Sequence, residues 1–494
     1  MESKDLKQNP RPRPLRTVVL LTLAMGLAGC AAGPDFQRPA PPKVAAYTAA
    51  PLPHQTASAA TNLGSAQRLD PGMVVDAQWW RSFQSPALDH FIDEALQGSP
   101  SLAAARATLR QAQELYAAQS GSTLYPQVDA GLSAERQRFN PIALGQSTGA
   151  RTFNLLNAGV GVRYNLDLAG GNRRALEALA AKADYQRFEL EAARLSLAGN
   201  IAGTAIKRAR LAAQIKATSA ILQAQEEQIE LAQGRVRLGQ ASPDEVLSLT
   251  TQAEQTRASL PTLRQQMQQS EHLLAALAGR APGAGGIPAF TLTDFTLPKA
   301  LPLVVPSELV RHRPDIQASE ALLHAANADY GVAVAKFYPQ INLSANLSSQ
   351  ALSSAALFGP GSAVWSLLGQ LTQPLFRPGL AAEKRAALAA FDAAAANYQN
   401  VVLEALRNVA DSLRAMDNDA QTLAALAVAD RAAQGSLHSV ERQYQLGAAS
   451  YLQVLVAQQQ AQQTRLGLLA AQAQRLSDTV ALYQAMGTLQ APGI

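Results

Sequence analysis

The sequence predicts a mainly α-helical protein that contains two copies of one unit, each with a pair of membrane-spanning β-strands and a very long helix. Three features support this fold class: a repeated phrase, alternating segments of about ten residues, and two long windows without proline. We expect the helices to form a coiled-coil barrel and the strands to form a transmembrane β-barrel, with four strands from each chain and twelve in a trimer.

The repeat is visible in two short segments of similar sequence. "RVRLGQASPDEVL" in the first half of the chain matches "RQYQLGAASYLQVL" in the second half, and the alignment places Gly239 on Gly447. With the same offset, Gly171 falls on Gly379. The chain therefore consists of two copies of one unit.

Four segments alternate between apolar and polar residues, as a β-strand with one apolar face does. They are residues 128–135, 157–168, 339–348 and 364–375, of which the second and third alternate most clearly. Each is about as long as a tilted strand that crosses a bilayer. A half-buried sheet in a soluble protein would give the same alternation, so the pattern alone leaves both structures open.

The longest expected helices follow the strand pairs. From Gly171 to Gly239 and from Gly379 to Gly447 the sequence has no proline, although the whole chain has 27 in 494 residues. A continuous helix of that length would extend about 100 Å, which requires a coiled bundle rather than a single globular core. Two further helical patterns precede the strand pairs, at residues 88–124 and 307–337.

A helix stop and a new helix start follow each other in both copies of the repeated phrase. Gly239 has the place of the glycine after a helix C-terminus, and Ser242 has the place of the next N-cap. Pro243 at the first helical position and Glu245 at the third complete a predicted capping box. The matching residues of the second copy are Gly447, Ser450 and Gln453. We therefore expect two tight turns between antiparallel helices, each about 100 Å from the membrane.

The N-terminus has the features of a bacterial lipoprotein signal peptide. A basic segment precedes an apolar run of about eleven residues, too short to span a bilayer, and the run ends in "LAGC". Cys30 is the only cysteine, so no internal disulfide is possible, and lipidation of Cys30 is preferred over a stray thiol. Because Ala31 rather than aspartate follows, we expect sorting to the outer membrane of a Gram-negative cell.

These features together predict the domain organisation. We expect a signal peptide at 1–29, a lipid-anchored extended tether at 30–76, repeat 1 at 77–280, an inter-repeat linker at 281–306, repeat 2 at 307–487 and a tail at 488–494. The tether is rich in Pro, Ala and Thr, and order should begin at "DAQWWRSFQ". Four strands per chain cannot close a barrel, and lipid does not tolerate open sheet edges, so we expect a homotrimer.

Composition and spacing argue against an enzyme or a nucleic-acid-binding protein. The formal net charge is +5, and the first 29 residues hold five basic and two acidic residues, so little positive charge remains for nucleic acid. The six histidines lack the spacing of a metal site, and a single lipidated cysteine leaves no thiolate ligand. We expect no cofactor, no metal ion and no catalytic residue.

Motifs along nearly the whole chain after Cys30 resemble those of the outer membrane factor family, the TolC-like efflux ducts, and in particular its NodT-type lipoprotein branch. They are "GPDFQRP", "WWRSFQSPAL", "RPDIQASEALL", "YPQ", "LTQPLF" and the doubled "LG-x-A-S", and their order and spacing are specific. The resemblance implies a trimeric channel-tunnel in the outer membrane. It would join an inner-membrane pump, usually of the resistance-nodulation-division type, through a periplasmic adaptor.

Two other functions stay open at this point. An outer membrane duct for type I protein secretion would have the same fold and would differ only in its partner. A lipid-anchored periplasmic adaptor is also helical, but it would have one hairpin and a soluble β domain instead of two hairpins joined to amphipathic strand pairs.

The resemblance also suggests which residues carry function. Adaptor contacts are expected at the turns, at Leu238, Gly239, Ser242, Leu446, Gly447 and Ser450. A resting gate is expected at Leu452 and Val456, four residues apart on one helix face, with Tyr444 latching the hairpins. Asp244 and Glu245 are expected to supply acid on the neighbouring hairpin. Many relatives carry a carboxylate at the position of Val456, so this gate is expected to be apolar and to close by dewetting. The alternative is ordinary coiled-coil packing by Leu452 and Val456.

Overall fold

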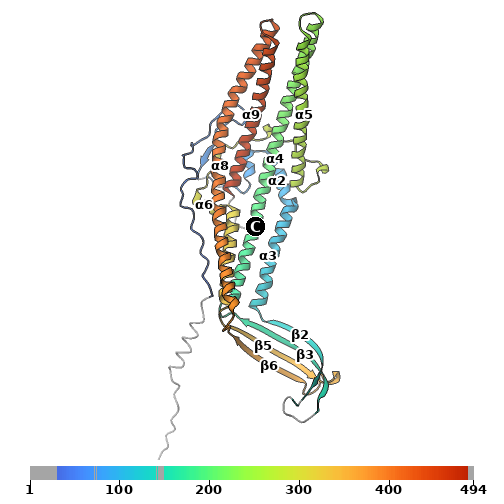
Figure 1. Ribbon diagram of the computed structural model, residues 1–494, viewed down its shortest axis with the longest axis vertical. Coiled ribbons are helices and arrows are strands. Elements are labelled where there is room, and N and C mark those ends of the chain that lie inside the picture. Colours follow the sequence, from blue (N-terminus) through green and yellow to red (C-terminus); the bar gives the residue numbers. More distant parts are fainter. Residues whose placement is uncertain (1–30, 72, 74, 141, 143–148, 488–494) are drawn as a thin grey trace, which may run out of the picture. The chain divides into compact units, whose positions relative to one another are not determined.

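The computed structural model describes residues 31–487 except 72, 74, 141 and 143–148 (Figure 1). The predicted signal peptide, Cys30 and the tail therefore lie outside the described residues. The chain divides into two compact units. The first unit comprises residues up to 38, 110–184 and 320–396, and the second comprises residues 39–109, 185–319 and those from 397 onward.

The sheet of the first unit contains all four predicted strands. They are β2 (Gln127–Phe139), β3 (Arg151–Leu166), β5 (Gln340–Ala351) and β6 (Ala363–Thr372). The strand order is β2-β3-β5-β6 and every neighbouring pair is antiparallel, so the hairpin of the first repeat lies directly beside that of the second (Figure 1). The prediction of four strands per chain is confirmed, and β2 and β6 form the two edges.

Two very long helices confirm the interpretation of the proline-free windows. α4 (Gly171–Arg237) has 67 residues and α8 (Pro378–Gln445) has 68. At a rise of 1.5 Å per residue, each helix is about 100 Å long. Both helices end two residues before the aligned glycines Gly239 and Gly447, so the internal repeat is confirmed in structure as well.

The helices before the strand pairs differ from the prediction, because each is broken in two. α2 (Pro86–Gly98) is followed by α3 (Pro100–Leu124), and α6 (Pro306–His312) is followed by α7 (Pro314–Ala335). A proline forces the preceding residue out of the helical region, and the ψ angles of Ser99 (123°) and Arg313 (122°) are accordingly extended. Each proline then occupies the first position of the next helix, where its missing N–H costs nothing.

Two helical hairpins extend from the second unit. α5 (Pro243–Leu277) runs back along α4, and α9 (Tyr451–Met486) runs back along α8 (Figure 1). α5 contains Pro261 in its interior, whereas α9 contains no proline. Among the residues that the structure describes, no helix combines the length and the apolar character needed to cross a membrane.

The interpretation of residues 30–76 as a tether is wrong for the part that packs onto the second unit. β1 (Arg68–Asp70) pairs in parallel with β4 (Ala300–Pro302). Gln67 is buried, and its side chain donates a hydrogen bond to the hydroxyl of Thr479 at 3.1 Å. The segment has little regular structure, as its Pro and Ala content predicts, but its polar groups find partners in the folded chain.

The inter-repeat linker also contributes to the core of the second unit. Phe290 and Leu301 are almost completely buried. Phe290 packs edge-to-face against Phe91 of α2, with 6.4 Å between the ring centroids. The prediction that order begins at "DAQWWRSFQ" is wrong, because β1 already pairs with β4 before this segment. The segment itself is packed as expected, since Trp79 is buried and stacks on Tyr483 at 5.3 Å.

A buried polar cluster lies on α9 within the second unit. Arg475 is only 1% exposed, and its guanidinium group donates to the side-chain oxygen of Gln67 at 2.8 Å. Nearby on the same helix, Asp478 is buried beside Asp419 of α8. Burial and the neighbouring Asp419 carboxyl raise the pKa of Asp478 to about 7, against the opposing effect of a hydrogen bond from Gln474.

We expect the melting temperature of the purified protein to decrease as the pH rises from about 4 to about 7. The folded chain keeps the Asp478 proton up to about pH 7, whereas the unfolded chain releases it near 3.8, so stability is lost as the pH rises between these values. Asp478→Asn should flatten this dependence and raise the melting temperature at the higher pH. Asp411→Asn removes an exposed carboxylate of α8 and serves as the control. Identical pH profiles for wild type and Asp478→Asn would contradict the prediction.

Candidate functional site

The four-stranded sheet has one continuous apolar face. The pairing register places even-numbered residues of β2 and β3 on the same face as odd-numbered residues of β5 and β6. The apolar face carries Val128, Ala130, Leu132, Ala134, Leu156, Ala158, Val160, Val162, Leu343, Leu347, Trp365, Leu367 and Leu371. No described segment of the chain covers this face, since Leu132 is 78% exposed and Trp365 is 77% exposed. Such an apolar surface needs lipid or another protein against it.

The opposite face of the sheet is polar and internally paired. Arg163 of β3 and Asp129 of β2 form an ion pair with a 2.5 Å contact. Asn165 donates a side-chain hydrogen bond to Asn342 of β5 at 2.7 Å. The alternation of a mainly apolar face with a mainly polar one matches strands that have lipid on one side and a water-filled interior on the other.

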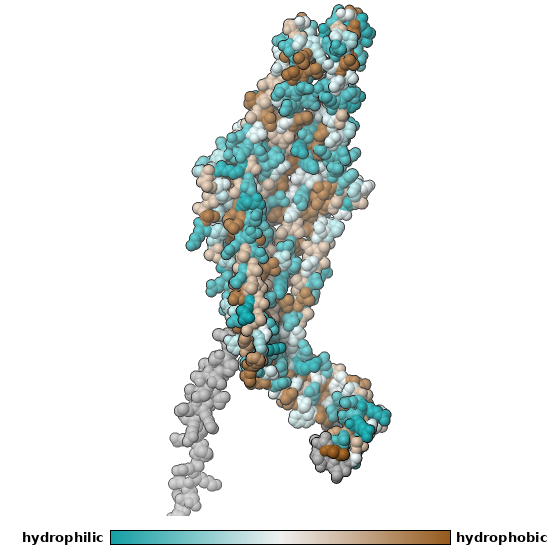
Figure 2. Space-filling view, viewed as in Figure 1, coloured by the Kyte–Doolittle hydropathy of each residue, from teal (hydrophilic) through white to brown (hydrophobic). Residues whose placement is uncertain are grey.

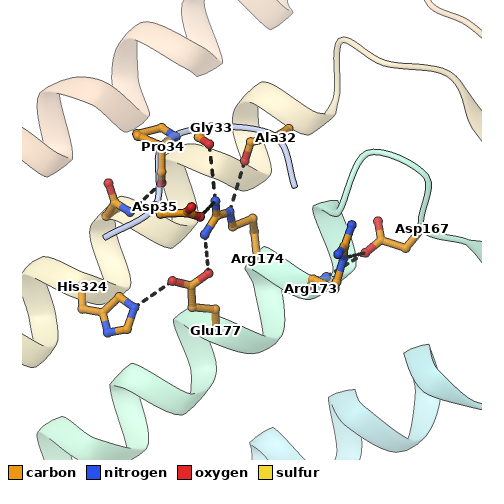
Figure 3. Close-up of polar contacts among 10 residues, drawn as sticks. Ala32, Gly33, Pro34, Asp35, Asp167, Arg173, Arg174, Glu177 and His324 are labelled. Carbon is orange, nitrogen blue, oxygen red and sulfur yellow. Dashed lines mark hydrogen bonds and ion pairs between the residues drawn. The ribbon is translucent and has the colours of Figure 1, made fainter. Parts of the chain in front are cut away.

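The N-terminal segment is clamped to the start of α4, beginning two residues after the predicted lipidation site (Figure 3). The guanidinium group of Arg174 donates to the backbone oxygens of Ala32 and Gly33, at 3.2 and 3.4 Å. It also forms ion pairs with Asp35 at 2.6 Å and with Glu177 at 2.7 Å. The Arg174 side chain is only 5% exposed, so these partners compensate a charge that has lost most of its water.

His324 of α7 extends this N-terminal clamp on the other side of Glu177. A ring nitrogen of His324 lies 2.8 Å from the Glu177 carboxylate, and the ring stacks on Phe36 at a centroid distance of 4.4 Å (Figure 3). Asn327 donates a hydrogen bond to the backbone oxygen of Pro34 at 3.0 Å. The clamp therefore joins three segments that are far apart in the sequence.

The backbone of the clamped segment is tightly enclosed. The N–H of Ala32 donates to the carbonyl oxygen of Ala169, between β3 and α4, at 2.7 Å. Gly33 has a φ of +83°, and a Cβ on it would lie 2.7 Å from the Cα of Gly331. Only glycine fits this position. No periodic signal in the sequence predicts the clamp, although "GPDF" belongs to the motifs that carry the family resemblance.

Both predicted tight turns close with the same backbone hydrogen bonds. Gly239 and Gly447 each donate to the carbonyl three residues earlier, at 2.9 and 3.0 Å, and the residue after each glycine donates to the carbonyl five residues earlier, at 2.8 Å. The φ angles of the two glycines are +72° and +76°. This is the glycine-terminated Schellman geometry, so the predicted helix stops are confirmed.

The predicted capping box is present at the second turn and absent at the first. At the second turn, the Ser450 hydroxyl accepts from the Gln453 N–H at 3.4 Å, and the Gln453 side chain accepts from the Ser450 N–H at 2.7 Å. At the first turn, Ser242 caps α5 by accepting from the Asp244 N–H at 3.3 Å. The prediction that Glu245 completes this box is wrong, because its carboxylate binds the other hairpin instead.

Glu245 connects the two hairpin ends. Its carboxylate accepts a hydrogen bond from the phenol of Tyr444 on α8. Arg235 of α4 lies 4.8 Å above the Tyr444 ring and 3.9 Å from the Glu245 carboxylate. Tyr451 packs edge-to-face against Tyr444 at 6.4 Å, and burial, together with the nearby Glu245, raises the pKa of Tyr451. Of the two acidic residues expected near Tyr444, Glu245 contacts it, whereas Asp244 is exposed.

The apolar residues predicted at the turns and at the gate are exposed within the chain. Leu238 and Leu446 at the turns are 73% and 84% exposed, and Leu452 and Val456 on α9 are 67% and 59% exposed. Figure 2 shows hydrophobic side chains at the surface near the ends of both hairpins. Leu452 and Val456 are thus not packing residues of their own hairpin, and any coiled-coil packing by them would involve another chain.

An amphipathic sheet of this width, joined to two helices about 100 Å long that each end in a helical hairpin, defines a channel protein of the TolC-like type. The sequence profile described as "Outer membrane efflux protein" matches residues 91–280 and 305–488. The chain belongs to this family of outer membrane efflux proteins. It is a protein of the outer membrane, and the members of its family are channels rather than enzymes.

Curated relatives and solved structures agree with this assignment. The chain is 30% identical over 480 residues to the pyoverdine export outer membrane protein OpmQ of Pseudomonas putida, covering 96% of this chain and 97% of that protein. It is 28% identical to the outer membrane protein OprJ of Pseudomonas aeruginosa, covering 96% of each. The fold matches the outer-membrane channel OprN with a TM-score of 0.84 at 25% identity, covering 93% of this chain and 99% of that one. It matches VceC of Vibrio cholerae with a TM-score of 0.78 at 29% identity, covering 84% and 99%.

Proposed function

We propose that three copies of this chain form one duct through the outer membrane and the periplasm, which is the outlet of a tripartite efflux system. The supporting observation is the four-stranded sheet, whose edge strands β2 and β6 each pair with a single strand within the described chain. In lipid, every unpaired backbone group at such an edge costs several kcal/mol. Three copies would pair all edges and give twelve strands, within the range of known membrane barrels.

Crosslinking of the protein in native membranes and in mild detergent tests this assembly. We expect a band of three chains, and we expect it to disappear when a proline is placed in the middle of edge strand β6, as in Leu367→Pro. Proline removes the N–H that the neighbouring strand needs. Leu375→Pro, beyond the end of β6, is the control and should leave the band in place. A stable monomer that still conducts ions would contradict the proposal.

Lipidation of Cys30 is the second part of the proposal. The N-terminal clamp supports it, because Ala32 is bonded to the junction between β3 and α4. Two residues of chain reach at most about 7 Å, so an acyl group attached two positions earlier would begin beside the inner end of the strands. Several acyl chains at that height would enter the inner leaflet, where two or more chains anchor a protein stably.

Cys30→Ser is expected to lose metabolic labelling with palmitate and to keep much of its transport activity, because the strands insert independently of the acyl chains. Mass spectrometry of the mature protein should find the N-terminus at Cys30 with acyl groups attached. An unmodified Cys30 in the purified protein would rule out this part of the proposal. Asp35→Asn, which loosens the clamp without removing the thiol, should retain the label.

The partners are proposed from the hairpin ends and from the relatives. The exposed turns at Gly239 and Gly447 suit the docking of helical hairpins of a periplasmic adaptor, since small residues allow close approach. Two similar proteins of Pseudomonas putida are the pyoverdine export outer membrane protein OpmQ and the efflux pump outer membrane protein TtgC. We therefore propose small-molecule efflux with a periplasmic adaptor and an inner-membrane pump of the resistance-nodulation-division class.

A duct for type I protein secretion is the alternative with the same fold. Affinity capture through a tag at the C-terminus, after crosslinking in cells, would separate the two. Recovery of an adaptor with a resistance-nodulation-division pump supports efflux, whereas recovery of an ATP-driven protein exporter supports secretion. The alternative of a periplasmic adaptor is disfavoured by the apolar four-stranded sheet and by the family assignment.

A further inference from the structure

Two arginines interrupt the apolar face of the sheet at its end away from the helices. Arg136 and Arg138 belong to the even-numbered residues of β2, so they lie on the same face as Ala130, Leu132 and Ala134. The register places them opposite the polar residues Asn154 and Thr152 of β3. Charged side chains on a lipid-facing surface are costly near the middle of the bilayer and inexpensive only near its surface.

The height of the two arginines follows from the register. The apolar face of β3 extends from Leu166 to Leu156, which is ten residue steps, or about 33 Å along the strand. A strand tilt of about 40° reduces this to about 25 Å, which equals the apolar band of outer membrane proteins. Arg136 lies opposite Asn154 and Arg138 lies opposite Thr152. These partners are two and four residues beyond Leu156 along β3. Both guanidinium groups therefore lie at the headgroups of the outer leaflet.

Neither arginine is neutralised by the chain. Within the described residues, Arg136 and Arg138 are exposed and make no ion pair and no hydrogen bond through their side chains. Arg163, on the polar face of the same sheet, differs, because Asp129 pairs with it at 2.5 Å. An unpaired pair of guanidinium groups at headgroup height, on the face that meets lipid, has the chemistry of a phosphate-binding site.

We propose that Arg136 and Arg138 bind the phosphate groups of lipopolysaccharide in the outer leaflet, with Asn154 and Thr152 contributing hydrogen bonds. Residues two apart on a strand project their side chains about 7 Å apart on one face, so the two guanidinium groups can engage one phosphorylated headgroup together. The planar fork of arginine favours bidentate contacts with phosphate oxygens. The proposal depends on the outer membrane location and on the register of β2, and it does not depend on the identity of the adaptor or pump.

Titration of the purified full-length protein in neutral detergent tests this site. The probes are bisphosphorylated lipid A, lipid A without phosphates, and phosphatidylglycerol, with binding followed by native mass spectrometry. We expect wild type to prefer bisphosphorylated lipid A over both other lipids. The double variant Arg136→Gln with Arg138→Gln should bind it about 25-fold more weakly, from about fivefold for each arginine.

The control variant removes the same charge elsewhere. Arg110→Gln with Arg151→Gln changes an exposed residue of α3 and a residue on the opposite face of the sheet, and it should bind lipid A like wild type. Equal melting temperatures of the three proteins exclude a folding defect. Equal lipid A affinity of both double variants would overturn the proposal, as would a wild type that binds phosphate-free lipid A or phosphatidylglycerol equally well.

Discussion

Gly447→Trp is expected to abolish transport without reducing the amount of folded protein. A Cβ at Gly447 would meet no atom of the chain within 4 Å, so a large side chain at this turn projects into open space. It would therefore obstruct only a partner that docks there. The φ of +76° adds a strain of about 1–2 kcal/mol, which is small against two helices of this length. The measurement is export of a pump substrate in cells that lack another outer membrane channel.

Two control variants separate docking from strain. Gly447→Asn keeps a residue that tolerates the left-handed region and should retain most activity. Gly361→Trp shares both properties of the test position, with a φ of +86° and no atom within 4 Å, but lies in the loop between β5 and β6. It should transport normally. If Gly447→Trp and Gly239→Trp both leave export normal, the turns are not the docking surface for the adaptor.

The double variant Leu452→Ser with Val456→Ser is expected to make the resting channel leak to ions and to large antibiotics. Both side chains are exposed within the chain, and four residues apart they share one face of α9. A ring of such residues from three chains would close a pore by excluding water, and hydroxyl groups would restore a continuous water column. An apolar constriction should also resist block by divalent cations, which bind carboxylate rings more strongly.

Single-channel recording of reconstituted protein measures this gate directly. The matched control is Leu231→Ser with Val428→Ser, a leucine and a valine with similar exposure (68% and 59%) on α4 and α8. It should leave the closed conductance unchanged. An unchanged closed conductance in the Leu452 and Val456 variant, with the assembly shown to be intact, would exclude these two residues as the gate.

Most of the architecture could be predicted because it follows from periodic signals. Alternation identified all four strands, the missing prolines identified α4 and α8, and the aligned glycines identified the turns. The breaks after Gly98 and His312 were also encoded, by Pro100 and Pro314, but the surrounding helical pattern concealed them. Local chemistry thus accounts for the elements and for most of their ends.

Contacts between distant segments could not be predicted in this way. Arg174 and Glu177 are three residues apart on a helix and resemble an ordinary surface pair, so nothing in the sequence indicates that Asp35 completes their cluster. Glu245 satisfies the pattern of a capping box, but a stronger partner, Tyr444, is 199 residues away. Such contacts leave no periodic pattern in the sequence, so they become visible only in the folded chain.

The N-terminal clamp has a consequence for the order of events during biogenesis. It closes only after residues as late as Asn327 have been made and folded, because Asn327 and Arg174 supply its donors. Once it is closed, only two residues of chain separate the proposed lipidation site from the body of the protein, so their reach is at most about 7 Å. A precursor that is still held in the inner membrane by its signal peptide could not bring the folded chain to the outer membrane. With the proposed lipidation at Cys30, signal peptide removal and acylation are therefore expected to precede release of the folded chain toward the outer membrane.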